Sequence, residues 1–263
     1  MSTDLVKHDP AEIALPDFGD AQFDPAPQAD RRVVYWRNGN PQMKKQGGFD
    51  YTGGWCISAD NVNPDILDPK VWDLQEFTNR KGDKTFSNYV APVIRVALLG
   101  WRVSWVARKR AEGERQTYQR KYGDGLTSYV EIAAICDSIK GGVVLTAKGM
   151  NGGKLKDVYS KAVKDLAVTF KKTIPPYAFY MAIGGEVDEK GAPKFTAYGK
   201  GEEQSSIVHI VPRWALDTAS LKAAQVPADV RDKAREFQIM LKAWKVERFQ
   251  EVIAAPDAEE GGF

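Results

Sequence analysis

Cysteine and histidine are scarce in this chain of 263 residues, which contains two of each. Cys56 and Cys136 both lie in apolar, strand-like segments, so we expect buried free thiols rather than a disulfide framework. The spacing of these cysteines, His8 and His209 does not correspond to a metal-ligand motif. We therefore expect a protein that uses neither a metal nor another cofactor.

Long apolar runs are absent as well. No segment approaches the roughly 20 apolar residues that a membrane-spanning helix requires. The first residues are acidic and lack both the basic and the apolar region of a signal peptide. From these features we expect a cytoplasmic protein that does not contact a membrane.

No catalytic signature stands out in the sequence, which has no GxSxG, no HExxH and no paired aspartate motif. Residues 149–155 (GMNGGKL) resemble a phosphate loop, but the spacing is one residue short and Leu155 stands where Ser or Thr is needed. This loop either takes one backbone phosphate at a helix N-terminus or is an ordinary turn. We expect no catalytic residues and a protein that is not an enzyme.

The net charge is only +2, but the charges are unevenly distributed. Residues 1–30 combine acids and prolines with a single lysine, which predicts a disordered acidic arm. Residues 31–49 are basic and contain no acid, whereas residues 254–263 are acidic again. This distribution favours a cationic surface in the middle of the chain that the acidic ends can shield.

The chain is organised around residues 89–124. The first part is apolar and β-branched, as in a strand buried on both faces. From Gly100 onward the side chains alternate, with Trp101, Val103, Trp105 and Ala107 on one face and Arg102, Ser104, Val106 and Arg108 on the other. A basic hairpin with interspersed tyrosines follows. Positive charges attract phosphates and flat rings stack on bases, so this segment predicts binding of a single-stranded nucleic acid.

Two alternatives remain open for this segment. The face that carries Trp101 and Trp105 belongs either to the core or to a base-stacking surface, and in the first case Arg102, Ser104 and Arg108 form the outward face. The hairpin either binds phosphates or is a solvated loop.

The remaining pattern predicts a mainly β (α+β) fold. Residues 59–88 have the composition of loops, and helices with one apolar stripe are expected at 153–171 and 229–253. Further strands are expected at 33–36, 51–58, 127–135, 142–146, 177–184, 194–198 and 207–211, with 177–184 and 194–198 as a hairpin. We expect residues 31–253 to form one OB-like β-barrel, with a helix between the third and fourth strands and an additional C-terminal helix.

The last segment, residues 254–263, predicts a flexible acidic tail that ends in an aromatic residue. Asp257, Glu259, Glu260 and Phe263 resemble the acidic tail of bacterial and phage single-stranded DNA-binding proteins, although two glycines precede Phe263 in place of the usual proline or acids. The resemblance implies that the tail recruits replication or repair proteins and competes with DNA for a basic groove. The length of the chain is closer to that of the phage members.

We therefore expect a sequence-independent single-stranded DNA-binding protein that protects and organises single strands in replication, recombination or repair. RNA as the ligand and homo-oligomerisation stay open. The candidate nucleic-acid-binding residues are Arg37, Lys44, Lys45, Tyr51, Trp55, Arg80, Lys81, Lys84, Phe86, Arg95, Trp101, Arg102, Trp105, Arg108, Lys109, Arg110, Tyr118, Arg120, Lys121 and Tyr122, with Trp36 as a further stacking candidate.

Three other functions stay open beside this one. The first is a strand-annealing or recombination protein that forms rings or filaments. The second is a nucleic-acid-processing enzyme with a carboxylate-bound metal. The third is an adaptor protein whose basic hairpin is only a solvated surface.

Overall fold

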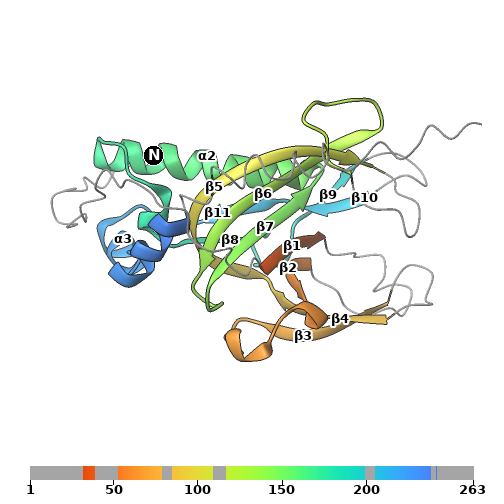
Figure 1. Cartoon of the computed structure of the whole chain (residues 1–263), viewed down its shortest axis with the longest axis horizontal. Coiled ribbons are helices and arrows are strands. Elements are labelled where there is room, and N and C mark those ends of the chain that lie inside the picture. Colours follow the sequence, from red (N-terminus) through yellow and green to blue (C-terminus); the bar gives the residue numbers. More distant parts are fainter. Residues whose placement is uncertain are drawn as a thin grey trace, which may run out of the picture.

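The computed structural model describes residues 32–38, 53–78, 85–108, 117–198, 205–237 and 241, and it shows a mixed α+β fold (Figure 1). The strands are β1 (Arg32–Asn38), β2 (Gly53–Ser58), β3 (Asp73–Thr78), β4 (Thr85–Ala91), β5 (Val93–Ala107), β6 (Leu126–Cys136), β7 (Gly142–Lys148), β8 (Met181–Gly185), β9 (Phe195–Tyr198), β10 (Ser205–Val208) and β11 (Ile210–Arg213). The α-helices include α2 (Met150–Phe170) and α3 (Thr218–Ala224), and residues 228–237 are also helical. Short 3-10 helices are present at η2 (Ala59–Asn61), η3 (Pro64–Ile66) and η4 (Pro176–Ala178).

Nine of these strands form one mixed sheet in the order β11-β8-β5-β6-β7-β1-β2-β4-β3. β1 and β7 pair in parallel, and the other neighbours pair antiparallel. β9 and β10 form a separate antiparallel ribbon, which lies on the same side of the molecule as the ends of β5 and β6 that face the hairpin (Figure 1). The long strand that the sequence predicted, β5, is an interior strand of the main sheet, between β8 and β6.

The sheet is curled but does not close into a barrel within the described residues. β4 and β5 follow one another directly around Pro92; β4 pairs with β2 and β3, whereas β5 pairs with β6 and β8. β2 approaches β8 through the Trp55 side chain, whose Nε1 donates a hydrogen bond to the Ile183 carbonyl at 3.0 Å. β2 and β8 are thus joined by a side chain and not by a ladder of backbone hydrogen bonds. The predicted closed barrel is therefore replaced by an open sheet.

The predicted apolar stripe of the first helix is confirmed, because Leu155, Val158, Ala162, Leu166 and Phe170 of α2 are all buried. The first three pack into a core cluster with residues from β1, β2, β5, β6, β7 and β8. In Figure 1, α2 runs along one side of β5, β6 and β7. Its predicted position is wrong, because seven strands rather than three precede it.

The other face of the sheet has its own apolar cluster. Ala97 and Leu99 of β5 pack there with Val144 of β7, and residues from the C-terminal part of the chain, including Ala234 and Leu241, cover them. A β-bulge between Leu98 and Gly100 lies between the two halves of β5. The inserted residue shifts the alternation of β5. Beyond the bulge, the odd-numbered Trp101 and Val103 therefore pack against the main core cluster, which the even-numbered side chains face before the bulge.

Two local predictions are wrong. Residues 59–88 are not only loops, since β3 and the start of β4 pair with one another there and β4 also pairs with β2. This strand pairing outweighs the loop-like composition. The expected hairpin of 177–184 with 194–198 does not form, because β8 pairs with β5 and β11 whereas β9 pairs with β10.

In the described part of the chain, no helix has the length and apolar character needed to cross a membrane.

Candidate nucleic-acid interface

The end of β5 that faces the predicted hairpin is held in place by backbone hydrogen bonds. Trp105 and Gln119 exchange two of them at 2.9 Å, and the Arg108 amide donates one to the Gly125 carbonyl at the same distance. The Arg108 Nε also donates to the Leu126 carbonyl at 2.9 Å. The segment 117–125 is therefore laid against β5 and positions its side chains beside those of the strand.

Aromatic rings gather at this end of the sheet. The Trp105 ring meets the Tyr122 ring edge-on, with centroids 5.0 Å apart, and Tyr118 meets Tyr129 of β6 in a similar way at 5.7 Å. Tyr122 is 58% exposed, and Trp105 and Tyr118 are half-buried. The Tyr122 ring therefore has a face that a base can reach, and Trp105 supports it from the side.

Exposed cationic residues accompany these rings in the same segments. Arg108, Arg120 and Lys121 are exposed, and they lie in the same segments as Trp105, Tyr118 and Tyr122. Asp124 is an exposed acid of the same loop. These residues, which we call the hairpin cluster (Trp105, Arg108, Tyr118, Arg120, Lys121 and Tyr122), are six of the predicted binding residues, and the structure brings them together.

A second, smaller group of predicted residues lies on β1 and β4. The Arg37 guanidinium lies over the Phe77 ring at 4.2 Å and over the Phe86 ring at 4.8 Å from the ring centroids. The two phenylalanine rings are themselves stacked, with centroids 5.8 Å apart. Arg37 and Phe86 are therefore engaged with each other and with Phe77 of the edge strand β3, away from the hairpin cluster.

Two predicted binding residues, Trp55 and Arg102, need correction because their side chains are already used. Trp55 is fully buried in the main core cluster, so its ring has no face for a base. The Arg102 Nε lies 2.6 Å from Glu131 Oε2, and this ion pair is buried, so Arg102 does not reach a phosphate. Ser104 is buried too, so the expected outward face of Arg102, Ser104 and Arg108 keeps only its last member.

Arg95 and Trp101 also lie apart from the hairpin cluster. Arg95 pairs with Asp137 at 3.3 Å and lies over the Tyr180 ring at 5.6 Å. Burial raises the pKa of Asp137, and the nearby Arg95 charge opposes that rise. Trp101 packs against the main core cluster with the Lys156 ammonium 5.0 Å above its ring, so it is mainly a core residue.

The other predicted residues lie outside the described part of the chain. They are Lys44, Lys45, Tyr51, Arg80, Lys81, Lys84, Lys109 and Arg110, together with Asp257, Glu259, Glu260 and Phe263 of the predicted tail.

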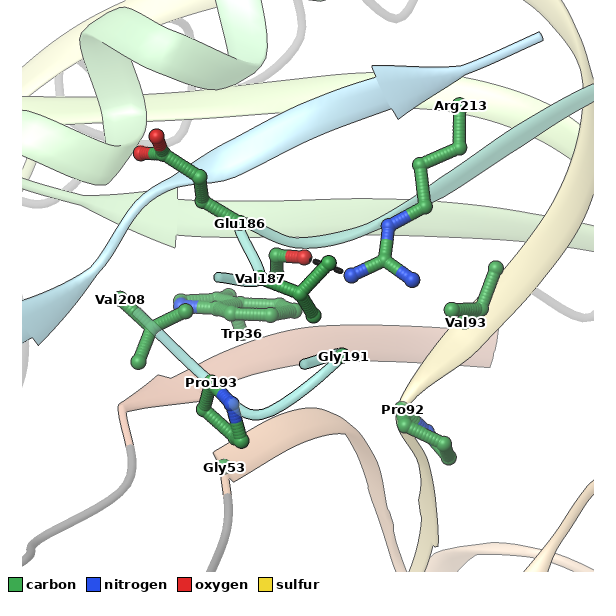
Figure 2. A pocket seen from close by; sticks show the side chains of 11 residues that line it. Trp36, Gly53, Pro92, Val93, Glu186, Val187, Gly191, Pro193, Val208 and Arg213 are labelled. Carbon is green, nitrogen blue, oxygen red and sulfur yellow. Dashed lines mark hydrogen bonds between the residues drawn. The ribbon is translucent and has the colours of Figure 1, made fainter. Parts of the chain in front are cut away.

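The sequence analysis missed a cavity of about 320 Å³, shown in Figure 2. Trp36, Pro92, Val187, Pro193 and Val208 line it, with Arg213 at one side. These residues come from β1, from the bend between β4 and β5, from the segment after β8, from β10 and from β11. Only Trp36 carried a signal in the sequence, because no local pattern connects residues so far apart in the chain.

Within the described residues, no group of three or more His, Cys, Asp or Glu side chains is placed to hold a metal ion. Comparison with family models, with curated proteins and with solved structures found no match to this chain.

Proposed function

We propose that this protein binds single-stranded nucleic acid, most suitably DNA, without sequence preference. The observation that carries the proposal is the hairpin cluster, in which the exposed Tyr122 ring meets Trp105 edge-on and the exposed cations Arg108, Arg120 and Lys121 lie in the same two segments. Every base offers a π-face to such a ring, and every nucleotide offers a phosphate to the cations. The proposed role is to protect and organise single strands in replication, recombination or repair.

Single strands fit this cluster better than a duplex does. In a duplex the bases are stacked on one another, so their flat faces are closed to Tyr122, whereas an unpaired strand can turn a base onto the ring. The cations then act on the phosphates on either side of the stacked base. The expected binding is therefore strongly dependent on salt and largely independent of sequence.

We also propose that the curled part of the sheet is OB-like. The bent β4–β5 segment supports this, since it pairs with β2 before Pro92 and with β6 and β8 after it. The packing of α2 against the core that the curl encloses gives further support. For the acidic tail, we propose that Asp257, Glu259, Glu260 and Phe263 recruit replication or repair proteins.

Fluorescence anisotropy with a labelled oligo-dT tests the binding proposal. Tyr122→Ala should weaken binding by about 5- to 150-fold, because base stacking on an aromatic side chain contributes about 1–3 kcal/mol. Tyr122→Phe keeps the ring and should bind like the wild type. Since Tyr122 is exposed, neither change should shift the melting temperature by more than a few degrees.

A charge variant provides an independent arm. Lys121→Gln should weaken binding and reduce its salt dependence, whereas Lys172→Gln, an exposed lysine just after the C-terminal end of α2, should change neither. Equal effects of the two lysine variants, or an unchanged affinity in Tyr122→Ala, would contradict the proposed position of the strand.

A further inference from the structure

The cavity of Figure 2 lies at the seam of the curled sheet. Trp36 and Gly53 come from β1 and β2 on one side of the seam, and Gly185 and Arg213 come from β8 and β11 on the other. Pro92 and Val93, at the bend between β4 and β5, line it as well. The volume of about 320 Å³ falls at the lower end of the range for small-molecule sites.

The Trp36 ring is held in a fixed orientation in this cavity. Its Nε1 donates a hydrogen bond to Asn38 Oδ1 at 3.0 Å, and its ring meets Trp55 edge-on with centroids 5.2 Å apart. A Cβ atom at Gly185 would lie 3.2 Å from the ring, so the glycine permits this close approach. An indole fixed in this way is a preformed surface for a flat ring and loses little conformational entropy on binding.

Arg213 gives the cavity a positive charge. Its guanidinium donates a hydrogen bond to the Gly185 carbonyl, and Figure 2 shows it beside Val187 and Trp36. A guanidinium has five N–H donors, so this bond leaves donors for an anionic ligand. Pro92, Val93 and Pro193 give the cavity apolar walls.

Glu186 also lines the cavity, but its charge is balanced. The Lys194 ammonium lies 2.7 Å from Glu186 Oε1, and this hydrogen bond lowers the pKa of the carboxyl group. Figure 2 shows the carboxylate directed away from Arg213. The carboxylate therefore stays ionised in its pair with Lys194 and does not neutralise Arg213.

Hydrogen bonds and strand pairing connect the cavity to the hairpin cluster. Asn151 Nδ2 donates to Asn38 Oδ1 at 2.8 Å and to the Val208 carbonyl at 3.0 Å, so the start of α2 is joined to both β1 and β10. Gly149, just before α2, accepts a hydrogen bond from Ser128 Oγ at 2.9 Å, and Ser128 is the β-sheet partner of Trp105. The cavity and the hairpin cluster therefore lie at the same end of the sheet.

We propose that this cavity binds one nucleotide, with the base against Trp36 and the apolar walls and the phosphate on Arg213. The inference deepens the proposed function, and it rests on that function where the nucleotide is taken as a unit of the bound strand. The same chemistry also fits a free mononucleotide. A flat ring beside a single guanidinium is the combination that a base and its phosphate require.

Binding of deoxythymidine monophosphate, measured by isothermal titration, tests the cavity directly. The wild type should bind it at least about tenfold more tightly than thymidine, which lacks the phosphate; tenfold is the effect expected for losing one charge-assisted hydrogen bond. Arg213→Gln should remove that difference, and Trp36→Leu should weaken both ligands. Arg231→Gln, in the helical segment 228–237, is the matched control and should leave binding unchanged.

A second variant covers the case in which Trp36→Leu or Arg213→Gln does not fold. Val187 is 38% exposed at the cavity, so Val187→Trp should fill the space from outside with little effect on the melting temperature. Loss of mononucleotide binding in this variant supports the proposal. Unchanged mononucleotide binding in folded Val187→Trp and Arg213→Gln, or no binding by the wild type, would overturn it.

Competition separates the two sources of the nucleotide. If oligo-dT displaces the mononucleotide, and Arg213→Gln also weakens oligo-dT, the cavity holds a unit of the strand. If the mononucleotide binds but oligo-dT does not displace it, the cavity binds free nucleotides. Only the part of the proposal that places a unit of the bound strand in the cavity is then wrong. If Tyr122→Ala loses oligo-dT binding but the wild type binds no mononucleotide, the proposed nucleotide site in the cavity is overturned and the proposed function stays intact.

Discussion

Arg102 and Glu131 form a bidentate ion pair directly across β5 and β6. The Arg102 Nε lies 2.6 Å from Glu131 Oε2, and Nη2 lies 3.2 Å from Oε1. Only 9% of the arginine side chain and 3% of the glutamate side chain are exposed. The pair therefore stabilises the sheet internally and is closed to a polyanion.

Replacing one member of this pair should destabilise the protein without changing the binding surface. Glu131→Gln leaves the Arg102 charge buried without its counter-charge, and we expect a loss of about 3–5 kcal/mol in the free energy of unfolding. Lys161→Gln is the control, because Lys161 pairs with Asp165 in an exposed i,i+4 arrangement worth about 0.5 kcal/mol or less. Urea denaturation measures both. A stable Arg102→Met variant that no longer binds oligo-dT would show that Arg102 contacts the strand after all.

Gly54 should be intolerant of substitution. It has φ +152°, and a Cβ atom there would lie 2.7 Å from the carbonyl oxygen of Ala91, just before the bend at Pro92. Gly54→Ala should lower the free energy of unfolding by about 1–3 kcal/mol, because the backbone of β2 or β4 must move. Gly125→Ala is the comparison, since a Cβ atom there meets nothing within 4 Å and only its φ of +75° is unfavourable. Thermal denaturation measures both variants, and an equal loss of unfolding free energy in Gly54→Ala and Gly125→Ala would contradict the close approach of β2 and β4.

The buried thiol of Cys136 should make stability depend on alkaline pH. Burial is the main cause that raises its pKa from 9.0 to about 11. The folded protein then holds a proton that the unfolded chain loses above about pH 9, so the free energy of unfolding falls as the pH rises towards 11, by up to about 1.4 kcal/mol per unit. Urea denaturation between pH 8 and 11 should show a shallower fall for Cys136→Ala than for the wild type.

Neither cysteine should react with a thiol reagent while the protein is folded. Cys56 and Cys136 are both buried, and only an accessible thiolate reacts quickly. Absorbance with an aromatic disulfide reagent at pH 8 should show almost no release in buffer and full release in denaturant. Rapid release in buffer would mean that one of the two thiols is accessible in the folded protein.

Removing the predicted acidic tail should separate folding from partner recruitment. Deletion of residues 257–263 should leave the melting temperature unchanged and leave oligo-dT binding equal or slightly tighter, because acids that compete with phosphates are lost. Capture of replication or repair proteins by the immobilised protein should be lost. Weaker oligo-dT binding after the deletion would mean that the tail belongs to the binding site.

The parts of the fold that the sequence predicted are those with a strong local pattern. The stripe from Leu155 to Phe170 recurs at helical spacing, and it is buried in α2 as expected. The alternation of β5 was also readable, but the bulge between Leu98 and Gly100 was not, because it is defined by pairing with β6. Burial of Arg102 likewise depends on Glu131, 29 residues farther along the chain.

The candidate site was only partly predictable for the same reason. Residues of the hairpin cluster are close in sequence, so their mixture of charges and rings could be recognised. The cavity could not, because Trp36 and Arg213 meet only after the sheet curls at Pro92. In the sequence, Trp55 and Trp105 are both aromatic residues of a predicted strand and look alike. Only the packing of β2 against β8 shows that the Trp55 ring is buried, whereas the Trp105 ring is half-buried.

A titration of intrinsic fluorescence with oligo-dT tests the central claim most directly, since the chain contains seven tryptophans. We expect quenching with tight binding at low salt and a steep loss of affinity at higher salt, with a slope of roughly −0.7 in log K against log salt for each phosphate contact. Duplex DNA of the same length should bind more weakly at both salt concentrations. No quenching and no binding at low salt, or equal affinity for single-stranded and duplex DNA, would contradict the claim that this protein binds single strands.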